Sequence, residues 1–334
     1  MPFDRASHRI VIAGASSLLG AELKSLLEQS RFAAADFRLL DEEIAAGILT
    51  EAGGEAVVIQ PVEESSFNKA RFVFFSGSPD FTRANLPLAQ QSSAVIVDLS
   101  GHSAALADSF AWFPGIEKLG GQALPEKPSL LGIPSAPAEA IVRLSFSLNG
   151  LGLRQLACTV LQPISTAGKP GIEELETQTS HLLSLQSPGK QLFDAQVAFN
   201  ALDRFGPSSR FDLRKALAVL RTEVHSCLRS NPVAPAIQLL QVPVFYGVTF
   251  SACAELDPSA DAARIHSACK AGGFSVAQAP ESPSNVSVAE ESVIHLGPAE
   301  ADPAKPGIWW FWGAADNIRL PAWNAFRLAE LLAE

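Results

Sequence analysis

The stretch His8-Arg-Ile-Val-Ile-Ala-Gly-Ala-Ser-Ser-Leu-Leu-Gly20 decides the fold of the N-terminal half of the chain. Its apolar run up to Ala13 is typical of a buried strand, and a glycine turn then leads into a helix that ends near Gln29. This order of strand, turn and helix predicts a dinucleotide-binding βαβ unit, because the N–H groups at the helix start face a phosphate. Ser17 replaces the middle glycine of the GxxGxxG spacing, so a plain βα turn without a ligand is the alternative.

A second strand is expected over residues 37–40, and it ends in the acidic run Asp41-Glu-Glu43. An acidic side chain about 20 positions after the glycine turn binds the ribose 2′-hydroxyl of NAD and repels the 2′-phosphate of NADP. If a dinucleotide binds, the sequence therefore predicts NAD in preference to NADP. A solvated acidic loop is the alternative interpretation of the same residues.

The remainder of the first 132 residues alternates between apolar runs and helical segments. Strands are expected at residues 56–59, 70–75 and 94–99, and a helix is expected to end near Gln91. Such alternation favours a parallel sheet, so the predicted fold class is α/β, with a Rossmann-like N-terminal domain over residues 1–132. The loops after the second and third of these strands lie at carboxyl ends, where ligands bind in such sheets.

The pattern changes after Arg143, where strands outnumber crossover helices. We expect an α+β domain over residues 133–314 with a mixed or antiparallel sheet, and a final segment, 315–334, that packs back on the first domain. The run Trp309-Trp-Phe-Trp312 is predicted to contribute to the core and to an interface. Because a sheet with one large apolar face commonly dimerises, a homodimer is expected. The expected elements are strands at 156–162, 237–244, 248–255, 287–296 and 308–314, and helices at 171–185, 213–228, 259–271 with Ser259 as N-cap, and 321–332.

The segment Leu131-Gly-Ile-Pro-Ser-Ala-Pro-Ala-Glu139 decides the function. It predicts the end of a strand followed by a helix, with Ala136 as N-cap and Pro137 in the first helical position. A side chain at such a helix start faces the positive end of the helix dipole, which stabilises a thiolate or an oxyanion. Ala136 offers only a methyl group, so the position suits a nucleophile that the sequence lacks.

The composition limits the partners and the compartment of the protein. The 334 residues carry a formal net charge of −10 and no Lys/Arg run, which argues against nucleic acid and an anionic membrane as partners. We find no secretory signal and no apolar run of about 18 residues, so we expect a cytoplasmic protein without a transmembrane helix. The cysteines lack the spacing of a zinc site, so no metal is predicted and reduced thiols are expected at Cys158, Cys227, Cys253 and Cys269.

Six segments in a fixed order carry a family resemblance. They are Gly14–Gly20, Ala94–Asp98, Gln162-Pro-Ile-Ser-Thr-Ala-Gly168, Glu173–Thr179, Gln241-Val-Pro-Val-Phe-Tyr-Gly247 and Ala315–Ile318. Together they make the chain resemble the aspartate-semialdehyde dehydrogenase family over nearly its full length. The resemblance implies NADPH-dependent reduction of L-aspartyl 4-phosphate to L-aspartate 4-semialdehyde, through a cysteine thiolate that forms a thioacyl-enzyme and a histidine that serves as acid/base. It also implies homodimers or tetramers.

Carried over position by position, the family's reactive residues are absent from this sequence. The nucleophile position is Ala136, the acid/base position is Val248, and the position of the substrate-carboxylate arginine is Gln241. The phosphate-binding arginine falls on Ala104. The arginine that binds the adenosine 2′-phosphate falls at about Ile44, beside the acidic run.

The resemblance also implies which site residues remain. The substrate-like residues are Gln162, Glu223 and Gln241, and the cofactor-binding residues are Gly14, Ser16, Ser17, Leu18, Leu19, Asp41, Ser76, Gly77, Ser165, Gly168 and Asn317. In these losses the chain is most similar to the Usg-type relatives of the family. Cys227 follows Glu223 by four positions and so shares its helix face, where ordinary packing is the simpler interpretation. His102, in a carboxyl-end loop, is more simply an ordinary loop histidine than a ligand.

Two functions therefore remain open. The first is a non-catalytic pseudoenzyme with a residual dinucleotide-type pocket, which acts by binding or assembly. The second is an NAD(P)-linked oxidoreductase that acts on the aldehyde or on another small substrate by a changed mechanism, with Glu223 as the titratable candidate. Either function would bring a small-molecule ligand, and the cofactor would be NAD or NADP with NAD preferred.

Overall fold

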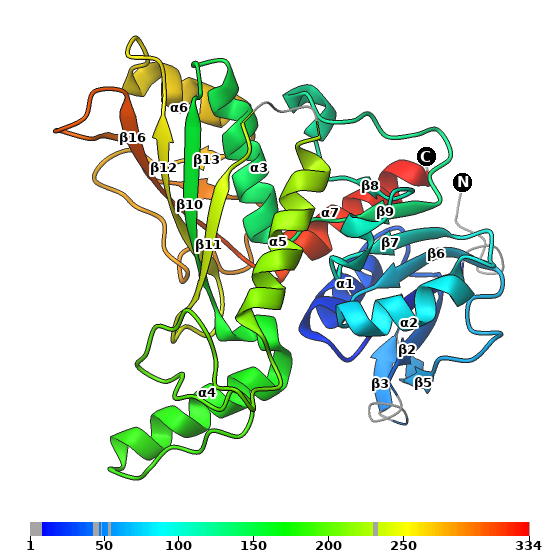
Figure 1. The fold of residues 1–334 in the computed structure, drawn as a ribbon. Helices are drawn as coiled ribbons and strands as arrows, with labels where there is room; N and C mark the ends of the chain where they lie inside the picture. Colours follow the sequence, from blue (N-terminus) through cyan, green and yellow to red (C-terminus); the bar gives the residue numbers. More distant parts are fainter. Residues whose placement is uncertain (1–8, 43–46, 48, 53–54, 230–232, 334) are drawn as a thin grey trace. The chain divides into compact units, whose positions relative to one another are not determined.

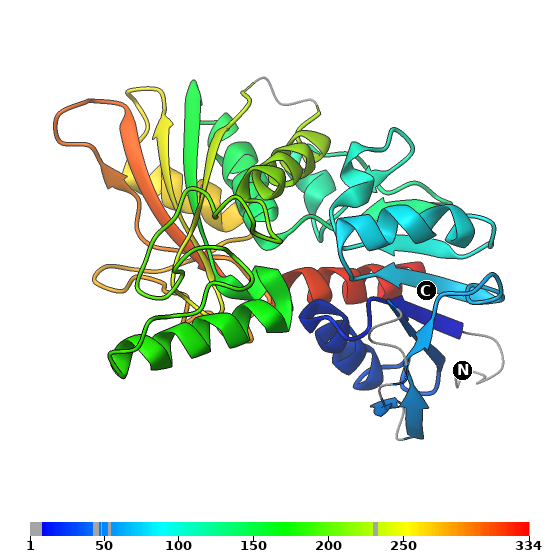
Figure 2. The same ribbon diagram turned by 60° about the horizontal axis from the view of Figure 1, so that its bottom comes forward.

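The computed structural model describes residues 9–42, 47, 49–52, 55–229 and 233–333. The chain divides into two compact units, which are drawn from blue to red along the sequence in Figures 1 and 2. Unit 1 consists of Met1–Ile116, Gln122–Ser135 and Pro321–Glu334, and unit 2 consists of Glu117–Gly121 and Ala136–Leu320.

The sheet of unit 1 contains, among the described residues, seven strands in the order β5-β2-β1-β6-β7-β9-β8, and every pairing is parallel. From β1 the chain steps to β2 on one side and later to β6 and β7 on the other, so the strand order reverses between β1 and β6. Ligands bind in such sheets at this switch point, beside the carboxyl ends of the strands. The strands are β1 (Arg9–Ala13), β2 (Asp36–Asp41), β5 (Gln60–Pro61), β6 (Ala70–Phe75), β7 (Val95–Asp98), β8 (Phe110–Ala111) and β9 (Leu130–Gly132).

Two of the helices of unit 1 follow strands of this sheet and cover it, α1 (Leu18–Glu28) after β1 and α2 (Pro79–Ala89) after β6. The crossovers from β1 to β2 and from β6 to β7 run in opposite directions, so right-handed connections place the two helices on opposite faces. The central strand β1 is therefore covered on both sides. This explains why Val11 and Ile12, whose side chains point to opposite faces, are both fully buried.

The end of the final helix, α7 (Arg319–Leu332), belongs to unit 1. Arg31 donates a hydrogen bond to the carbonyl of Glu330, and Arg71 donates one to the carbonyl of Leu332 at 3.1 Å. Cationic side chains at a helix C-terminus satisfy its free carbonyls and oppose the negative end of its dipole. These two arginines therefore fasten the end of the chain to unit 1.

The sheet of unit 2 is mixed, with the strand order β11-β10-β12-β16-β14-β13 and with β15 paired to β16. β10 pairs with β11 in parallel and with β12 antiparallel, and β12 pairs antiparallel with β16. The strands are β10 (Gln155–Gln162), β11 (Ala236–Gln241), β12 (Val248–Glu255), β13 (Ser275–Val276), β14 (His295–Leu296), β15 (Glu300–Ala301) and β16 (Ile308–Ala315), and the helices are α3 (Ala136–Asn149), α4 (Gly168–Leu183), α5 (Leu213–Cys227) and α6 (Ala262–Ala271).

The two faces of this sheet have different surroundings. Helix α3 packs on β10 and β12, and α5 packs on β11. Leu156 and Val160 of β10 point to this side and are fully buried. The alternate residues Ala157 and Thr159 point to the other side and are only half-buried, because successive side chains of a strand point to opposite faces.

The structure corrects the predicted starts of two helices. α3 begins at Ala136, so the predicted N-cap was wrong by one residue, and Ser135 precedes the helix. α6 begins at Ala262 with Asp261 as N-cap, so the prediction of Ser259 was also wrong. Asp261 Oδ1 accepts the Arg264 N–H at 2.8 Å, whereas the N–H of Ser259 is bound to Asp257 Oδ1 at 2.9 Å in the preceding turn.

Four further predicted boundaries were wrong. The strand expected over residues 287–296 shrinks to His295–Leu296, because residues 284–291 form successive turns in which Ala289 and Glu291 donate their N–H groups to nearby carbonyls. The strand expected at 56–59 is β4 (Glu55–Val58), which pairs antiparallel with β3 (Leu49–Ala52) outside the parallel sheet. β11 ends at Gln241 because Val244 donates its N–H back to the Val242 carbonyl at 2.9 Å. α4 starts at Gly168 rather than Gly171, since its first turn tolerates Pro170.

Candidate functional site

The glycine turn lies at the switch point of unit 1, where it packs against the loop after β6. Gly14 has a positive φ of 93°, and a Cβ built there would lie 2.2 Å from the N of Gly77. A Cβ on Gly20 would lie 2.4 Å from the Gly14 carbonyl oxygen. Ser76 Oγ donates to that oxygen at 3.1 Å, and Ser17 Oγ donates to the Ser76 carbonyl at 2.9 Å. Gly14 and Gly20 are thus required because backbone segments of the chain touch at these positions, whether or not a ligand binds.

The start of α1 presents free backbone donors at the same point. Ser17 is the N-cap, and its Oγ accepts the Gly20 N–H at 2.9 Å, so this serine has a capping role in place of the expected glycine. Leu18 and Leu19 follow, and N–H groups in the first turn have no acceptor within the helix. The structure therefore brings the predicted residues of the turn together in an arrangement suited to an anion.

Asp41 is the last residue of β2 and reaches the glycine turn. It is 8% exposed, its Oδ2 accepts the Ser16 N–H at 2.7 Å, and its Oδ1 accepts the Glu42 N–H at 2.9 Å. The sequence predicted Asp41 as a ribose ligand, and the structure places it in the turn with both oxygens hydrogen-bonded. Glu42 is exposed, and Glu43 and Ile44 lie outside the described residues.

A second buried carboxylate, Asp98 at the end of β7, was missed at the sequence level. It is fully buried, and its Oδ1 accepts both the N–H of Ser100 at 2.8 Å and the hydroxyl of Ser100 at 2.6 Å. Its Oδ2 accepts the Ser103 N–H at 2.7 Å, which shapes the short helix that holds His102 and Ala104. An Asp two residues before a Ser at a strand end is the signal of such a turn.

In unit 2 the position of the expected nucleophile is a buried methyl group. Ala136 is 1% exposed and is the first residue of α3. One turn on, Glu139 forms an ion pair with Arg143 at 2.7 Å, and both side chains are almost fully buried. This pair is internal to α3. Val248, at the expected acid/base position, is also buried, at 2% exposure.

Gln162 and Gln241 lie side by side at the ends of β10 and β11. Gln241 is 2% exposed, and its Nε2 donates to the Gln162 carbonyl at 2.9 Å and to the Val242 carbonyl at 3.0 Å. Its Oε1 accepts from Gln162 Nε2 at 3.4 Å, and its backbone pairs with that of Leu202. Gln241, where the family resemblance led us to expect the substrate arginine, is therefore neutral and hydrogen-bonded within the chain.

A second polar group of unit 2 joins three segments that are distant in sequence. Asn317 Oδ1 accepts the Gly247 N–H at 2.9 Å, and Asn317 Nδ2 donates to Ser165 Oγ at 3.1 Å. Gly168 lies three residues after Ser165, has a positive φ of 70° and starts α4. The structure thus brings together two of the predicted cofactor residues, Ser165 and Asn317, and Asn317 binds Gly247, which directly precedes Val248 in the sequence.

Glu223 lies among other buried groups on α5. It is 5% exposed. Burial raises the pKa of Cys227 above the usual range of a thiol, and the charges of Glu223 and then Glu139 raise it further. Glu223 is therefore close to Cys227, as their four-residue spacing predicts, and Cys227 is a protonated thiol at neutral pH.

The other thiols are also protonated at neutral pH. Burial raises the pKa of Cys158 and of Cys269 to about 12. Partial burial and the charge of Asp302 raise the pKa of Cys253. Within the described residues, no group of His, Cys, Asp and Glu is arranged to hold a metal ion, and no helix there is long and apolar enough to cross a membrane.

Comparison with known proteins identifies the family. Residues 148–320, more than half of the chain, match the profile of the semialdehyde dehydrogenase dimerisation domain. The chain belongs to the semialdehyde dehydrogenase family. Residues 9–117 match the NAD-binding domain of semialdehyde dehydrogenases, and this part contains the glycine turn. The family and the fold class predicted from the sequence, a Rossmann-like parallel sheet followed by a mixed sheet, are thereby confirmed.

Individual relatives of the semialdehyde dehydrogenase family match the whole chain. A USG-1 protein homolog from Azotobacter vinelandii is 28% identical over 333 residues, which cover 97% of each chain. Aspartate-semialdehyde dehydrogenase 2 of Vibrio cholerae is 24% identical over 329 residues, with the same coverage of 97%. The solved structure of a probable aspartate-semialdehyde dehydrogenase from Pseudomonas aeruginosa is 26% identical, with a TM-score of 0.85 and 98% of both chains covered.

Proposed function

We propose that this semialdehyde dehydrogenase homologue is non-catalytic and acts by binding and assembly. The observation that carries the proposal is the buried methyl group of Ala136 at the first position of α3. By the family resemblance this position holds the nucleophile, and a methyl group cannot form a thioester. Val248, at the acid/base position, has no proton to transfer.

The neutral Gln241 supports the same conclusion for substrate binding. A substrate that carries a carboxylate and a phosphate needs cations at fixed positions, and an uncharged amide supplies far less attraction in a buried site. Gln241 is also held by hydrogen bonds to Gln162 and Val242, so its amide is already used. Ala104, at the phosphate-arginine position, is likewise uncharged.

The remaining thiols and Glu223 do not favour a replacement mechanism. The raised pKa of each cysteine disfavours the thiolate, which is the reactive form. Glu223 lies buried beside Cys227, where a structural role accounts for it. The oxidoreductase alternative therefore has no further observation in its favour.

An assay with the purified protein tests the proposal directly. L-Aspartate 4-semialdehyde, phosphate and either NADP or NAD are supplied, and the reduced cofactor is followed by absorbance. We expect no turnover above the rate without protein. Turnover that survives replacement of all four cysteines would overturn the proposal in favour of a changed mechanism.

For the cofactor, we propose a dinucleotide-type pocket at the glycine turn that prefers NAD to NADP. The preference is supported by the carboxylate of Asp41, which lies 2.7 Å from the Ser16 N–H and repels a 2′-phosphate nearby. Calorimetric titration of the protein with NAD and with NADP tests it. Tighter binding of NADP would contradict the preference.

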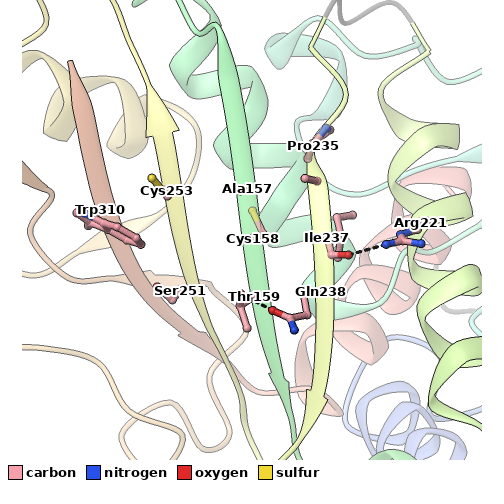
Figure 3. A pocket seen from close by; sticks show the side chains of 11 residues that line it. Ala157, Cys158, Thr159, Arg221, Pro235, Ile237, Gln238, Ser251, Cys253 and Trp310 are labelled. Atoms are coloured by element: carbon pink, nitrogen blue, oxygen red, sulfur yellow. Dashed lines mark hydrogen bonds between the residues drawn. The ribbon is translucent and has the colours of Figure 1, made fainter. Parts of the chain in front are cut away.

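We also propose a homodimer formed through the outer face of the unit 2 sheet, which is the face opposite α3 and α5 to which Ala157 and Thr159 point. A groove of about 560 Å³ crosses β11, β10, β12 and β16 on this face, as Figure 3 shows. Its floor includes the small side chains of Ala157, Thr159 and Ser251, and Trp310, which is 45% exposed, stands at its edge. A large aromatic side chain beside a groove of small residues suits a self-complementary interface, and the matched family domain is named for dimerisation.

Light scattering after size-exclusion chromatography tests the dimer. The unaltered protein should elute with the mass of two chains, and Trp310→Arg should elute as a monomer, because a guanidinium in the interface would be desolvated. Val286→Arg, at a site that is 76% exposed in the same unit and outside the groove, is the matched control and should remain dimeric. A monomeric unaltered protein would contradict the proposal.

A further inference from the structure

The carboxylate of Asp41 occupies a backbone donor of the glycine turn, which is the kind of group that binds phosphates in such turns. Its Oδ2 lies 2.7 Å from the Ser16 N–H, in the middle of the glycine turn. The side chain is 8% exposed, so it is held in the turn and is not a freely solvated acidic group. Hydrogen bonds from backbone N–H groups to an ionised carboxylate are short and strong, like those to a bound anion.

The backbone donors of the turn that precede α1 are also satisfied within the chain. The N–H groups of Gly14 and Ala15 both point to the Leu40 carbonyl, at 2.9 and 3.1 Å. The Ser17 N–H is bound to the Gly14 carbonyl at 3.1 Å. Among the N–H groups of residues 14–17, that of Ser16 is the one bound by a side chain, Asp41, and all four are satisfied without a ligand.

We infer that Asp41 is a built-in anion of the glycine turn, which completes the turn in the absence of nucleotide and competes with phosphate groups for the Ser16 N–H. This inference deepens the proposed dinucleotide-type pocket and rests on it. It differs from the usual assignment of an acidic residue at this strand end, in which the carboxylate is a ligand of the nucleotide ribose. The two roles predict opposite effects of removing the carboxylate.

The experiment compares thermal unfolding of the unaltered protein, Asp41→Ala and Asp41→Asn, each with pyrophosphate, NAD or NADP and with chloride at equal ionic strength. The unaltered protein should keep its Tm with chloride, pyrophosphate and NADP, whereas NAD, which the proposed pocket binds, should raise it. Asp41→Ala should unfold about 3–6 °C lower, because a charge-assisted hydrogen bond is lost. Pyrophosphate and NADP, but not chloride, should restore much of that loss, because they supply the missing anion.

Two variants keep the test decisive. Asp41→Asn has the same shape, retains one acceptor oxygen and should fold even if Asp41→Ala does not, and it should bind NADP more tightly than the unaltered protein does. Glu42→Gln removes a neighbouring exposed charge and should change neither the Tm nor the response to phosphates. Circular dichroism checks that each variant is folded.

Other outcomes would overturn the inference. If NAD stabilises the unaltered protein and Asp41→Ala abolishes that effect, Asp41 is a ribose ligand. If Asp41→Ala lowers the Tm but no phosphate restores it, Asp41 stabilises the turn without competing with phosphate groups for the Ser16 N–H. These readouts do not depend on turnover, so a failure of the non-catalytic proposal in the enzyme assay would be seen separately.

Discussion

The glycine turn of unit 1 has the close backbone packing and helix start that suit a nucleotide, whereas the strand ends of unit 2 hold neutral groups at the positions where the family resemblance led us to expect reactive residues. In the turn, Gly14 and Gly77 touch backbone to backbone, so any side chain at Gly14 would collide. At the strand ends, Gln241 is compatible with the fold because its amide is fully hydrogen-bonded. The comparison teaches that close packing alone requires the glycines of the turn. At the strand ends of unit 2, by contrast, the packing does not require a charged or reactive side chain.

The largest effect is expected in the turn. Gly14→Val places a side chain against the Gly77 backbone at a φ of 93°, so we expect a loss of about 2–4 kcal/mol in the free energy of unfolding. Denaturant unfolding measures the change. Gly115→Ala is the control, since its φ is 84° but no atom lies within 4 Å of the new Cβ, and it should cost about 1 kcal/mol. Equal losses would show that contact with Gly77 is unimportant.

The second prediction restores a cation at the strand ends of unit 2. Gln241→Arg buries a guanidinium at a position that is 2% exposed and breaks the hydrogen bonds to Gln162 and Val242, so we expect a loss of about 2–3 kcal/mol. Gln191→Arg, at an exposed position of the same unit outside the groove, should be nearly neutral. A stable Gln241→Arg variant would mean that the site still accommodates the charge.

The third prediction concerns how the free energy of unfolding depends on pH. The effect is expected from unit 2, because all four cysteines lie there. Burial raises the pKa of Cys158 and Cys269 from 9.0 to about 12. Between these pH values the unfolded chain releases thiol protons that the native chain keeps, so the free energy of unfolding falls as pH rises. The expected slope is about 1.4 kcal/mol per pH unit for each thiol, and full stability is present below the lower value.

Denaturant unfolding at a series of alkaline pH values measures this slope. Cys269→Ala should make this slope less steep by the contribution of one thiol. The cavity that the substitution leaves lowers the free energy of unfolding equally at every pH, so it does not change the slope. An unchanged slope would contradict the raised pKa of Cys269.

The smallest effect is expected when the thiol alone is restored. Ala136→Cys adds one sulfur atom at a buried position, so we expect a change in stability below about 1.5 kcal/mol and no turnover in the semialdehyde assay. The physical reason is that Val248 and Gln241 still supply neither a base nor a cation. Turnover by this single variant would show that the strand ends remain competent for the chemistry.

The parallel sheet of unit 1 was predictable because its signals are local. Alternating apolar runs and the glycine turn lie within a few residues of one another, and the closeness of Glu223 and Cys227 follows from helix geometry. The pairing of Gln162 with Gln241 joins residues 79 positions apart and depends on the register of β10 and β11, which no local pattern specifies. The prediction of a strand over residues 287–296 was wrong because turn hydrogen bonds within residues 284–291 compete with strand pairing.

The attachment of the α7 end by Arg31 and Arg71 has a consequence for biosynthesis. Unit 1 is assembled from three chain segments, and the last of them, Pro321–Glu334, is translated after the whole of unit 2. On the ribosome, unit 2 can therefore mature while unit 1 still lacks its closing segment. A premature stop codon just before this segment would leave the later-made half of the polypeptide intact and damage the half that was synthesised first.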